Sequence, residues 1–168
     1  APSGLTVGRI TARGEIAGQW PDLNHSGSLE SVEFKVPQLN PMNVDGHWTG
    51  HGTNIVTDAI ATSGQGRLAV TAQVDLTQVV VDAATIDHGG AQVLQRQSPT
   101  TIDWREGWRV TGGVVMGAGF DGNVDHLTAL KGSLRVRAQN PSLSWISDWW
   151  TLPSEIESIE TLQVAATW

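Results

Sequence analysis

The sequence predicts an all-β fold, and three observations carry that prediction. Between residues 67 and 76, apolar side chains occupy every second position, and only Ala69 interrupts the polar residues between them. A period of two is typical of a strand with one apolar and one solvent-facing side. The same alternation returns at 32–36, 134–138 and 162–168. In addition, 19 glycines in 168 residues exceed the usual share of about 7%, which favours many short turns between strands.

The expected elements follow in chain order. Residues 5–16 alternate with a slip of one residue near Gly8 and Arg9, which fits a β-bulge. A turn region containing Pro, Asn and Gly is expected at 19–28, and the stretch 44–52 stays ambiguous. About ten strands are expected in all. After the first, they lie at 29–36, 54–62, 68–76, 78–87, 91–95, 101–104, 108–111, 114–116, 134–138 and 162–168.

One short helix is expected at 141–150. Asn140 suits its N-cap, and Pro141 suits the first helical position, where the missing N–H costs no intrahelical hydrogen bond. Pro153 then interrupts the chain before the last strand.

Composition limits both size and function class. The chain of 168 residues suits one domain, 1–168, and the absence of cysteine excludes disulfides and thiolate metal sites. A formal charge of -7, with 10 scattered Lys and Arg, argues against a nucleic-acid partner. No run reaches the roughly 18 apolar residues of a membrane span, and the start does not have the pattern of a signal peptide. Because both ends fall inside strand-like patterns, we expect a fragment of a longer repetitive protein.

Two local patterns resemble cofactor or calcium sites, and each has a simpler interpretation. The GxGxxG at 117–122 follows an apolar strand, but the helix and acidic residue that a dinucleotide site requires do not follow. A glycine turn is therefore favoured. Asp121, Asn123 and Asp125 are spaced like the start of a calcium loop. The sixth position is His instead of Gly and the twelfth is Gly instead of Glu, which favours a solvated turn.

Histidines and carboxylates do not form a convincing catalytic or metal set either. His47 and His51 are four residues apart, which on a strand is about 13 Å, too far to share a metal ion. Glu155, Glu157 and Glu160 are interpreted as a solvated edge, and the sequence contains neither GxSxG nor HExxH. We expect a protein that is not an enzyme, with no cofactor and no metal.

Tryptophan is the strongest compositional oddity. The chain has 8 Trp against 2 Phe and no Tyr, and they are spread along its length. Core packing and anchoring at strand ends are the main interpretation, while a sugar-binding platform and contact with an apolar ligand stay open. The residues are Trp20, Trp48, Trp104, Trp108, Trp145, Trp149, Trp150 and Trp168.

Two parts of the chain resemble the repeats of a known family. The run AATIDHGGAQVL at 83–94, followed by QSPTTIDW at 97–104 and by 108–110, is similar to repeating units of the TamB (translocation and assembly module) family in the AsmA-like superfamily. So is LSWISDWW at 143–150, with the Leu-Pro that follows it and the strand up to the last residue. In that family a strand enters a short helical stretch that ends in Leu-Pro and returns as the next alternating strand. The resemblance covers most of the chain from about Gly64 onward.

The resemblance implies a fold, a cellular location and a function. The fold would be an elongated U-shaped β-taco, a repeating β-groove, or an open β-sandwich of antiparallel strands with one short helix. The parent protein would be anchored in the inner membrane and cross the periplasm of a Gram-negative bacterium. It would carry phospholipid between the inner and outer membranes, shielding acyl chains in its groove. It would also aid outer-membrane protein assembly with an outer-membrane barrel of the TamA/Omp85 type.

The predicted groove is the apolar side of the alternating strands. A trough of Leu, Val, Ile and Ala offers acyl chains a dry surface without directional bonds. The same side chains could instead form the core of a closed β-sandwich, although small residues such as Ala72 and Ala138 leave room for a groove. Two further functions stay open, a carbohydrate-binding β-sandwich and a structural adhesion or stalk module. The expected lipid-groove lining is Val32, Phe34, Val36, Leu68, Val70, Ala72, Val74, Leu76, Leu134, Val136, Ala138, Leu162 and Val164.

Overall fold

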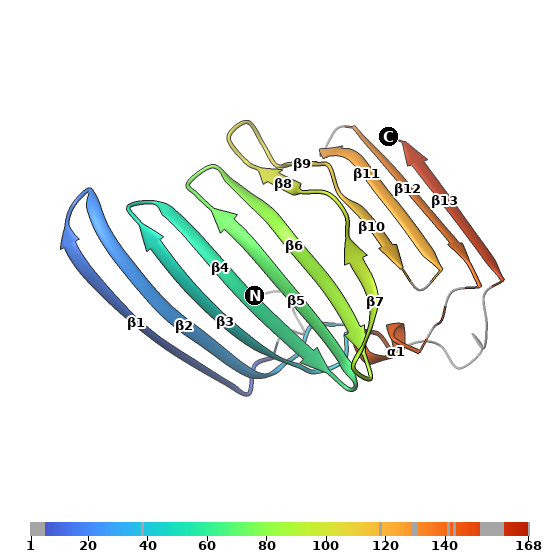
Figure 1. Cartoon of the computed structure of the whole chain (residues 1–168), viewed down its shortest axis with the longest axis horizontal. Helices are drawn as coiled ribbons and strands as arrows, with labels where there is room; N and C mark the ends of the chain where they lie inside the picture. The colour runs from blue at the N-terminus through green and yellow to red at the C-terminus, as the bar shows by residue number, and fades with distance from the viewer. Residues whose placement is uncertain are drawn as a thin grey trace.

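A computed structural model of the chain contains one curved antiparallel sheet and a single short helix, α1 (Ile146–Trp149), in its described part (Figure 1). The predicted all-β class is therefore confirmed. The structure describes residues 6–37, 39–117, 119–128, 131–140, 142, 144–151 and 160–167.

The sheet has thirteen strands within these residues. They are β1 (Arg9–Gln19), β2 (Asp22–Phe34), β3 (Met42–His51), β4 (Asn54–Ser63), β5 (Gly66–Val74), β6 (Gln78–His88), β7 (Ala91–Arg96), β8 (Thr100–Asp103), β9 (Arg109–Thr111), β10 (Val114–Gly117), β11 (Phe120–Thr128), β12 (Gly132–Gln139) and β13 (Thr161–Thr167).

The strands form a meander with an interruption in its middle. β7 and β8 follow one another along β6, β7 beside the C-terminal part and β8 beside the N-terminal part of β6. β7 pairs on its other side with β10, and β8 pairs with β9. β11 pairs with both branches, with β10 at 120–123 and with β9 at 126–128, around a bulge between Val124 and His126. We call the junction between the β7–β10 branch and the β8–β9 branch the seam.

The strand register gathers the apolar side chains on one side of the whole sheet, which we call the apolar face. Leu68 on β5 lies opposite Ala61 on β4 and Ile86 on β6, and Ile86 lies opposite Leu94 on β7. Residues directly opposite each other share a face, so alternation in each strand extends the same face to its neighbours. At the two edges of the sheet, the apolar face carries Ile10, Ala12 and Ile16 on β1 and Val164 and Ala166 on β13.

The opposite side is polar and is linked by side-chain hydrogen bonds between strands. Thr71 Oγ1 donates to Asp58 Oδ1 at 2.6 Å across β4 and β5. Arg67 pairs with Asp87 across β5 and β6, with 3.3 Å between nitrogen and oxygen. A sheet with one polar and one apolar side is what a period of two produces.

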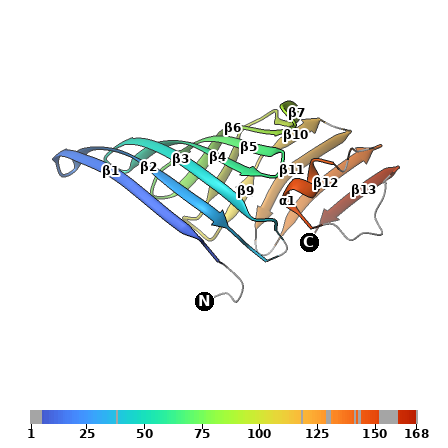
Figure 2. The same ribbon diagram turned by 90° about the horizontal axis from the view of Figure 1, so that it is seen from below.

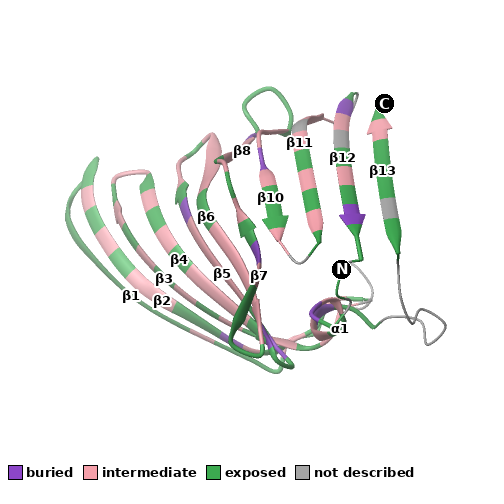
Figure 3. Ribbon diagram, turned by 45° about the vertical axis from the view of Figure 1, so that its right-hand side comes forward, coloured by how far each residue is buried: buried purple, intermediate pink, exposed green. Residues whose placement is uncertain are grey.

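α1 packs on the apolar face and forms the only cluster of buried hydrophobic side chains in the described part of the chain. Its Trp149 and the preceding Trp145 pack on Leu94, and partly buried residues from β4, β5, β6 and β11 surround them. The rings of Trp145 and Phe120 meet edge to face, with centroids 5.5 Å apart. In a flat sheet β4 and β11 would be more than 20 Å apart, about twice the diameter of a helix, so the apolar face curves around α1. Figure 3 shows α1 at one end of the strands, between the β1–β6 and β10–β13 parts.

Polar contacts fasten α1 to the ends of the strands. The Asn40 side chain donates to the carbonyls of Ser147 and Asp148, at 2.7 and 3.1 Å. The Asp148 carboxylate accepts a hydrogen bond from Gln65 N at 3.0 Å and lies 2.6 Å from His88 Nδ1. These contacts tie the connections β2–β3, β4–β5 and β6–β7 to one helical turn.

The structure corrects three expectations about individual elements. The helix begins at Ile146 and not at Pro141, and Asn140 adopts a left-handed conformation with φ 44° and does not cap the helix. Most of the predicted turn at 19–28 is strand, because β1 and β2 are joined by Trp20 and Pro21 alone. Strand β11 was not expected. Pro141, Leu143 and the Leu-Pro at 152–153 lie outside the described residues.

The accessible surface shows how open the sheet is. The chain exposes 10846 Å², whereas a compact globular monomer of 17.9 kDa exposes about 8000 Å². The described residues therefore form a single layer partly covered by α1, and a closed sandwich core does not form among them.

Removing a tryptophan of α1 should destabilise the fold far more than removing an exposed one. Trp149 is 6% exposed, so Trp149→Ala leaves a cavity and should lower the free energy of unfolding by about 3–5 kcal/mol. Trp108 is 50% exposed, and Trp108→Ala should change the free energy by no more than about 0.5 kcal/mol. Urea unfolding followed by far-UV circular dichroism measures both. Equal losses in the two variants would contradict the role of α1.

Candidate functional site

The apolar face away from α1 is the main candidate site, because large apolar side chains on it meet solvent. Ile16 on β1 is 74% exposed and Val164 on β13 is 41% exposed. Exposed apolar side chains that adjoin one another on one face are typical of a binding surface, while scattered ones are not informative. The other exposed members of this face are Ile10, Leu29 and Val115.

The apolar face deepens into a hollow of about 320 Å³ at the seam. Leu94, Val115, Phe120 and Val136 contribute apolar side chains, and the backbone of 112–113 forms part of the wall where the two branches separate. Because Phe120 and Leu94 also contact α1, the hollow directly adjoins the buried cluster. A concave apolar surface with few polar groups is the kind of site that takes up hydrocarbon.

Near the β1 edge, the apolar face carries an indole ring laid across two strands. Trp48 projects from β3 over Gly27 of β2, and its Cζ2 atom lies 3.4 Å from the position that a Cβ on Gly14 of β1 would occupy. A Cβ on Gly27 would overlap this ring. The two glycines therefore make the space that the indole occupies. An aromatic ring that covers glycines on a neighbouring strand supports the strand register.

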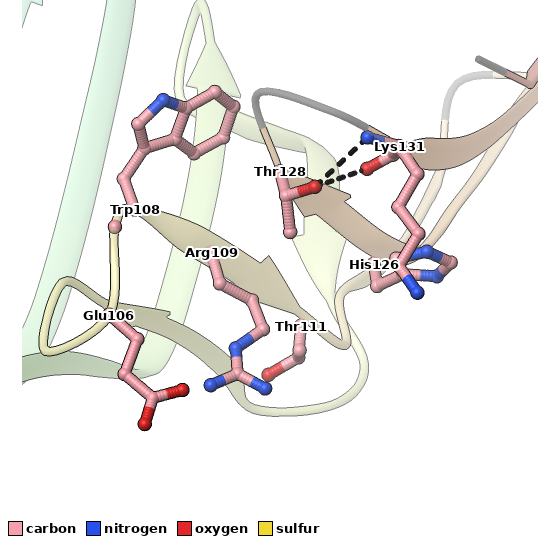
Figure 4. Close-up of a pocket in the computed structure, with 8 residues that line it drawn as sticks. Glu106, Trp108, Arg109, Thr111, His126, Thr128 and Lys131 are labelled. Atoms are coloured by element: carbon pink, nitrogen blue, oxygen red, sulfur yellow. Dashed lines mark hydrogen bonds between the residues drawn. The ribbon is translucent and has the colours of Figure 1, made fainter.

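A second, larger concavity of about 870 Å³ lies on the polar side of the sheet (Figure 4). Arg109 and Thr111 of β9 and His126 of β11 come from the polar face, with Lys131 beside them. Thr128 Oγ1 donates to Lys131 O at 2.7 Å and accepts from Lys131 N at 3.0 Å. These contacts belong to the β11–β12 turn. The apolar hollow is the better candidate for a binding site, since it is smaller, continuous with the apolar face and next to the buried cluster.

Most of the predicted groove residues lie on the apolar face in the register of their strands. Those with described side chains are Phe34, Leu68, Val70, Ala72, Val74, Val136, Ala138 and Val164. Leu134 and Leu162 occupy matching positions in the backbone register, and their side chains are outside those described.

Three predicted groove residues lie elsewhere. Val32 pairs with Arg9 on the polar side, as the regular alternation of β2 requires when Leu29 and Ser31 lie on the apolar face. The register shift between Ser31 and Phe34, where Glu33 has φ 54°, places Phe34 on the apolar face instead. Val36 lies beyond the end of β2. Leu76 lies in the connection between β5 and β6 and is 72% exposed.

Several residues of the apolar face were missed by the sequence interpretation. Val115, Phe120 and Trp48 belong to stretches where the predicted strands are too short or the pattern is ambiguous. The signal for Trp48 was present, since Val44, Gly46, Trp48 and Gly50 alternate with polar residues, but glycine at two positions of the apolar side weakened the pattern.

The glycine-rich and calcium-like patterns lie in a strand end, a turn and a strand. Gly117 is the last residue of β10 and Gly119 lies in the turn to β11, while Asp121 and Asn123 are within a strand and not in a loop. Within the described ranges, no group of three or more His, Asp or Glu could hold a metal ion. His51 contacts Asn24 Oδ1 at 3.0 Å. Glu155 and Glu157 are outside the described residues.

The tryptophans divide between packing and exposure. Trp145 and Trp149 are buried, and Trp104 Nε1 donates to Leu76 O at 2.8 Å. Trp20 and Trp150 are exposed. Because these side chains are far apart in the sheet order, they do not combine into one flat platform.

The carboxylates with shifted acidity serve turns. Hydrogen bonds from the Thr77 side chain and backbone lower the pKa of Asp75, and hydrogen bonds from Arg105 lower the pKa of Asp103. Asp75 lies in the β5–β6 connection and Asp103 is the last residue of β8, and in each case the hydrogen bonds hold the ionised carboxylate in place.

No family model, no curated protein and no solved structure matches the chain. None of the helices described is both long enough and apolar enough to cross a membrane.

A single methyl group at Gly27 should disturb the ring of Trp48. The added Cβ of Gly27→Ala would overlap both the ring of Trp48 and the carbonyl oxygen of Arg13, and we expect the free energy of unfolding to fall by about 1–3 kcal/mol, as in other overpacked sites. Gly46→Ala is the matched control, since its new Cβ would have no atom nearer than 3.9 Å. Urea unfolding monitored by tryptophan fluorescence measures both variants. If both variants unfold at the same urea concentration as the wild type, Trp48 does not lie over Gly27.

Proposed function

We propose that the apolar face binds the acyl chains of phospholipids, and that the chain is a segment of a periplasmic lipid conduit of the TamB type. The observation that carries the proposal is the apolar face, which runs from β1 to β13 and is covered by α1 at one end only, in the part of the chain that is described. Its hollow at the seam is lined mainly by apolar side chains.

The chemistry of the face suits hydrocarbon. Each CH₂ group removed from water contributes about 0.8 kcal/mol, so a few methylenes in the hollow supply useful affinity. The attraction is non-directional, and an acyl chain can shift along the face without breaking specific bonds. The hollow has few polar groups, so it would leave few of them unpaired under a bound chain.

The resemblance of the residue pattern to TamB repeats is the support for the wider role. In this proposal the parent protein is held in the inner membrane of a Gram-negative bacterium. Its groove shields acyl chains between the two membranes, and it meets an outer-membrane barrel of the TamA/Omp85 type. The chain acts without catalysis and without a cofactor, because carrying lipid along a groove forms and breaks no covalent bond.

An acidic side chain in the hollow should abolish lipid retention, while the same change on the other side of the sheet should not. Val115→Asp puts a carboxylate on the hollow, and burying it against an acyl chain is costly. Val56→Asp is the matched control, because Val56 is 48% exposed and lies opposite Gln73 on the polar side. Native mass spectrometry of the purified proteins should show phospholipid adducts on the wild type and on Val56→Asp, reduced at least about tenfold on Val115→Asp.

Three results would contradict the proposal. The first is a chain free of phospholipid even after incubation with phosphatidylethanolamine and phosphatidylglycerol vesicles. The second is an equal loss of adducts in the two variants while both stay folded. The third is quenching of tryptophan fluorescence by oligosaccharides without any by lipid, which would favour a carbohydrate-binding module instead.

A further inference from the structure

β1 is a long open edge of the sheet. It pairs with β2 over its whole length, Arg9–Gln19, and no strand of the described chain pairs with its other side. Nearly every residue of β1 is exposed. An uncovered edge of this length offers a row of backbone donors and acceptors to another strand.

The backbone groups that face outward can be assigned from three glycine contacts. A Cβ on Gly18 would lie 2.6 Å from Asp22 O, and one on Gly14 would lie 3.2 Å from Ser26 O. A Cβ on Gly27 would overlap Arg13 O. The carbonyls of the flanking residues therefore point between β1 and β2, so Gly14 and Gly18 are in non-hydrogen-bonded pairs with β2. By alternation, the even-numbered residues from 10 to 18 direct their N–H and C=O groups to the open edge.

The polar side of β1 carries two opposite charges that have no ion-pair partner among the described residues. Arg13 lies opposite Ser28, and Glu15 lies opposite Ser26. Neither occurs in the ion pairs of the described chain, whereas Arg9 pairs with Glu30 at 3.6 Å. Arg13 and Glu15 are on either side of Gly14, so a two-fold axis through Gly14 exchanges their positions.

We propose that β1 pairs with β1 of a second copy, antiparallel and centred on Gly14. This register overlaps all of 9–19 and puts each outward-facing even residue opposite another, giving about ten hydrogen bonds between the two strands. Arg13 of each copy then lies opposite Glu15 of the other, in the closely spaced non-hydrogen-bonded pairs where side chains interact most.

The pairing also continues the apolar face. A two-fold axis perpendicular to the sheet leaves both apolar faces on the same side, with Ala12 opposite Ile16 and Ile10 opposite Gly18 of the other copy. Trp48, which reaches Gly14, would lie near the axis in both copies. The other edge strand, β13, has only Thr161, Gln163, Ala165 and Thr167 on its polar side, so it offers no charge to Arg13 or Glu15. The proposal does not depend on lipid binding.

Charge reversal tests the pairing and its symmetry. Arg13→Glu puts two acidic residues opposite each other in both symmetric pairs, and Glu15→Arg does the same with two basic residues. Each single variant should dimerise at least about tenfold more weakly than the wild type in sedimentation velocity at low salt. The double variant Arg13→Glu/Glu15→Arg should dimerise like the wild type, and an equimolar mixture of the two single variants should form heterodimers.

Two controls fix the register and the fold. Arg9→Gln should leave dimerisation unchanged, because Arg9 lies opposite Gln19 in this register. Since the chain has no cysteine, a mixture of Ala12→Cys and Ile16→Cys proteins should form an intermolecular disulfide on oxidation, whereas neither should cross-link alone. Circular dichroism of each variant checks that the sheet is intact.

A chain that is monomeric at all concentrations would overturn the proposal. So would a dimer that is indifferent to both charge reversals, or one whose association is not recovered in the double variant. None of these results bears on the lipid proposal, because native mass spectrometry detects phospholipid adducts on the monomer and on the dimer alike.

Discussion

The whole structure depends on the docking of α1 against the apolar face. A single-layer sheet has one apolar side that needs a cover, and within the described residues this cover is one helical turn with two buried tryptophans. Asn40 and Gln65 contact it from two strand connections, and His88 contacts it from the end of β6. The turn thereby sets the curvature of the sheet at one end and leaves most of the apolar face exposed. Figure 2, which is turned by 90° from Figure 1, shows α1 near the ends of β3 and β5 and beside β12.

The interruption of the sheet at the seam gives the apolar face a hollow. β7 and β8 follow one another along β6, and β9 and β10 follow one another along β11, so the seam is a break in two neighbouring strand positions. Gly112 and Gly113 join β9 to β10 at this break with positive φ angles of 71° and 116°, which favour glycine. Since glycine brings no side chain, the break leaves a hollow lined by the apolar residues around it. The positive φ angles that require glycine at 112 and 113 are thus also the reason why the apolar face has a hollow there.

Alternation alone was enough to predict most of the sheet. The strand at Gly66–Val74 was predicted within two residues of its observed bounds, because five apolar positions in strict alternation permit one register. The prediction failed where glycine replaced side chains. β11 was missed because Gly117, Gly119 and Gly122 indicate a turn, although Gly122 lies in the strand opposite Val136.

The face of Val32 and the extent of the helix could not be obtained from the sequence. Val32 keeps the regular alternation of β2 and therefore faces the polar side, whereas a bulge with Glu33 in a left-handed conformation returns Phe34 to the apolar face, and nothing in an alternating pattern marks such a shift. The helix was overestimated because Asn140 and Pro141 suit a helix start, while the observed turn is held by contacts with residues about 60 to 110 positions away. An open face and a closed core also require the same alternation, so only the three-dimensional arrangement separates them.

The central claim is that hydrocarbon occupies the apolar face, and paramagnetic broadening of methyl resonances by a phospholipid with a doxyl group on its acyl chain tests it most directly. Broadening should be strong for Val115, Val136 and Val164 and weak for Val56, since the first three lie on the apolar face and Val56 on the polar one. Equal broadening on both sides of the sheet, or none on either, would contradict the account.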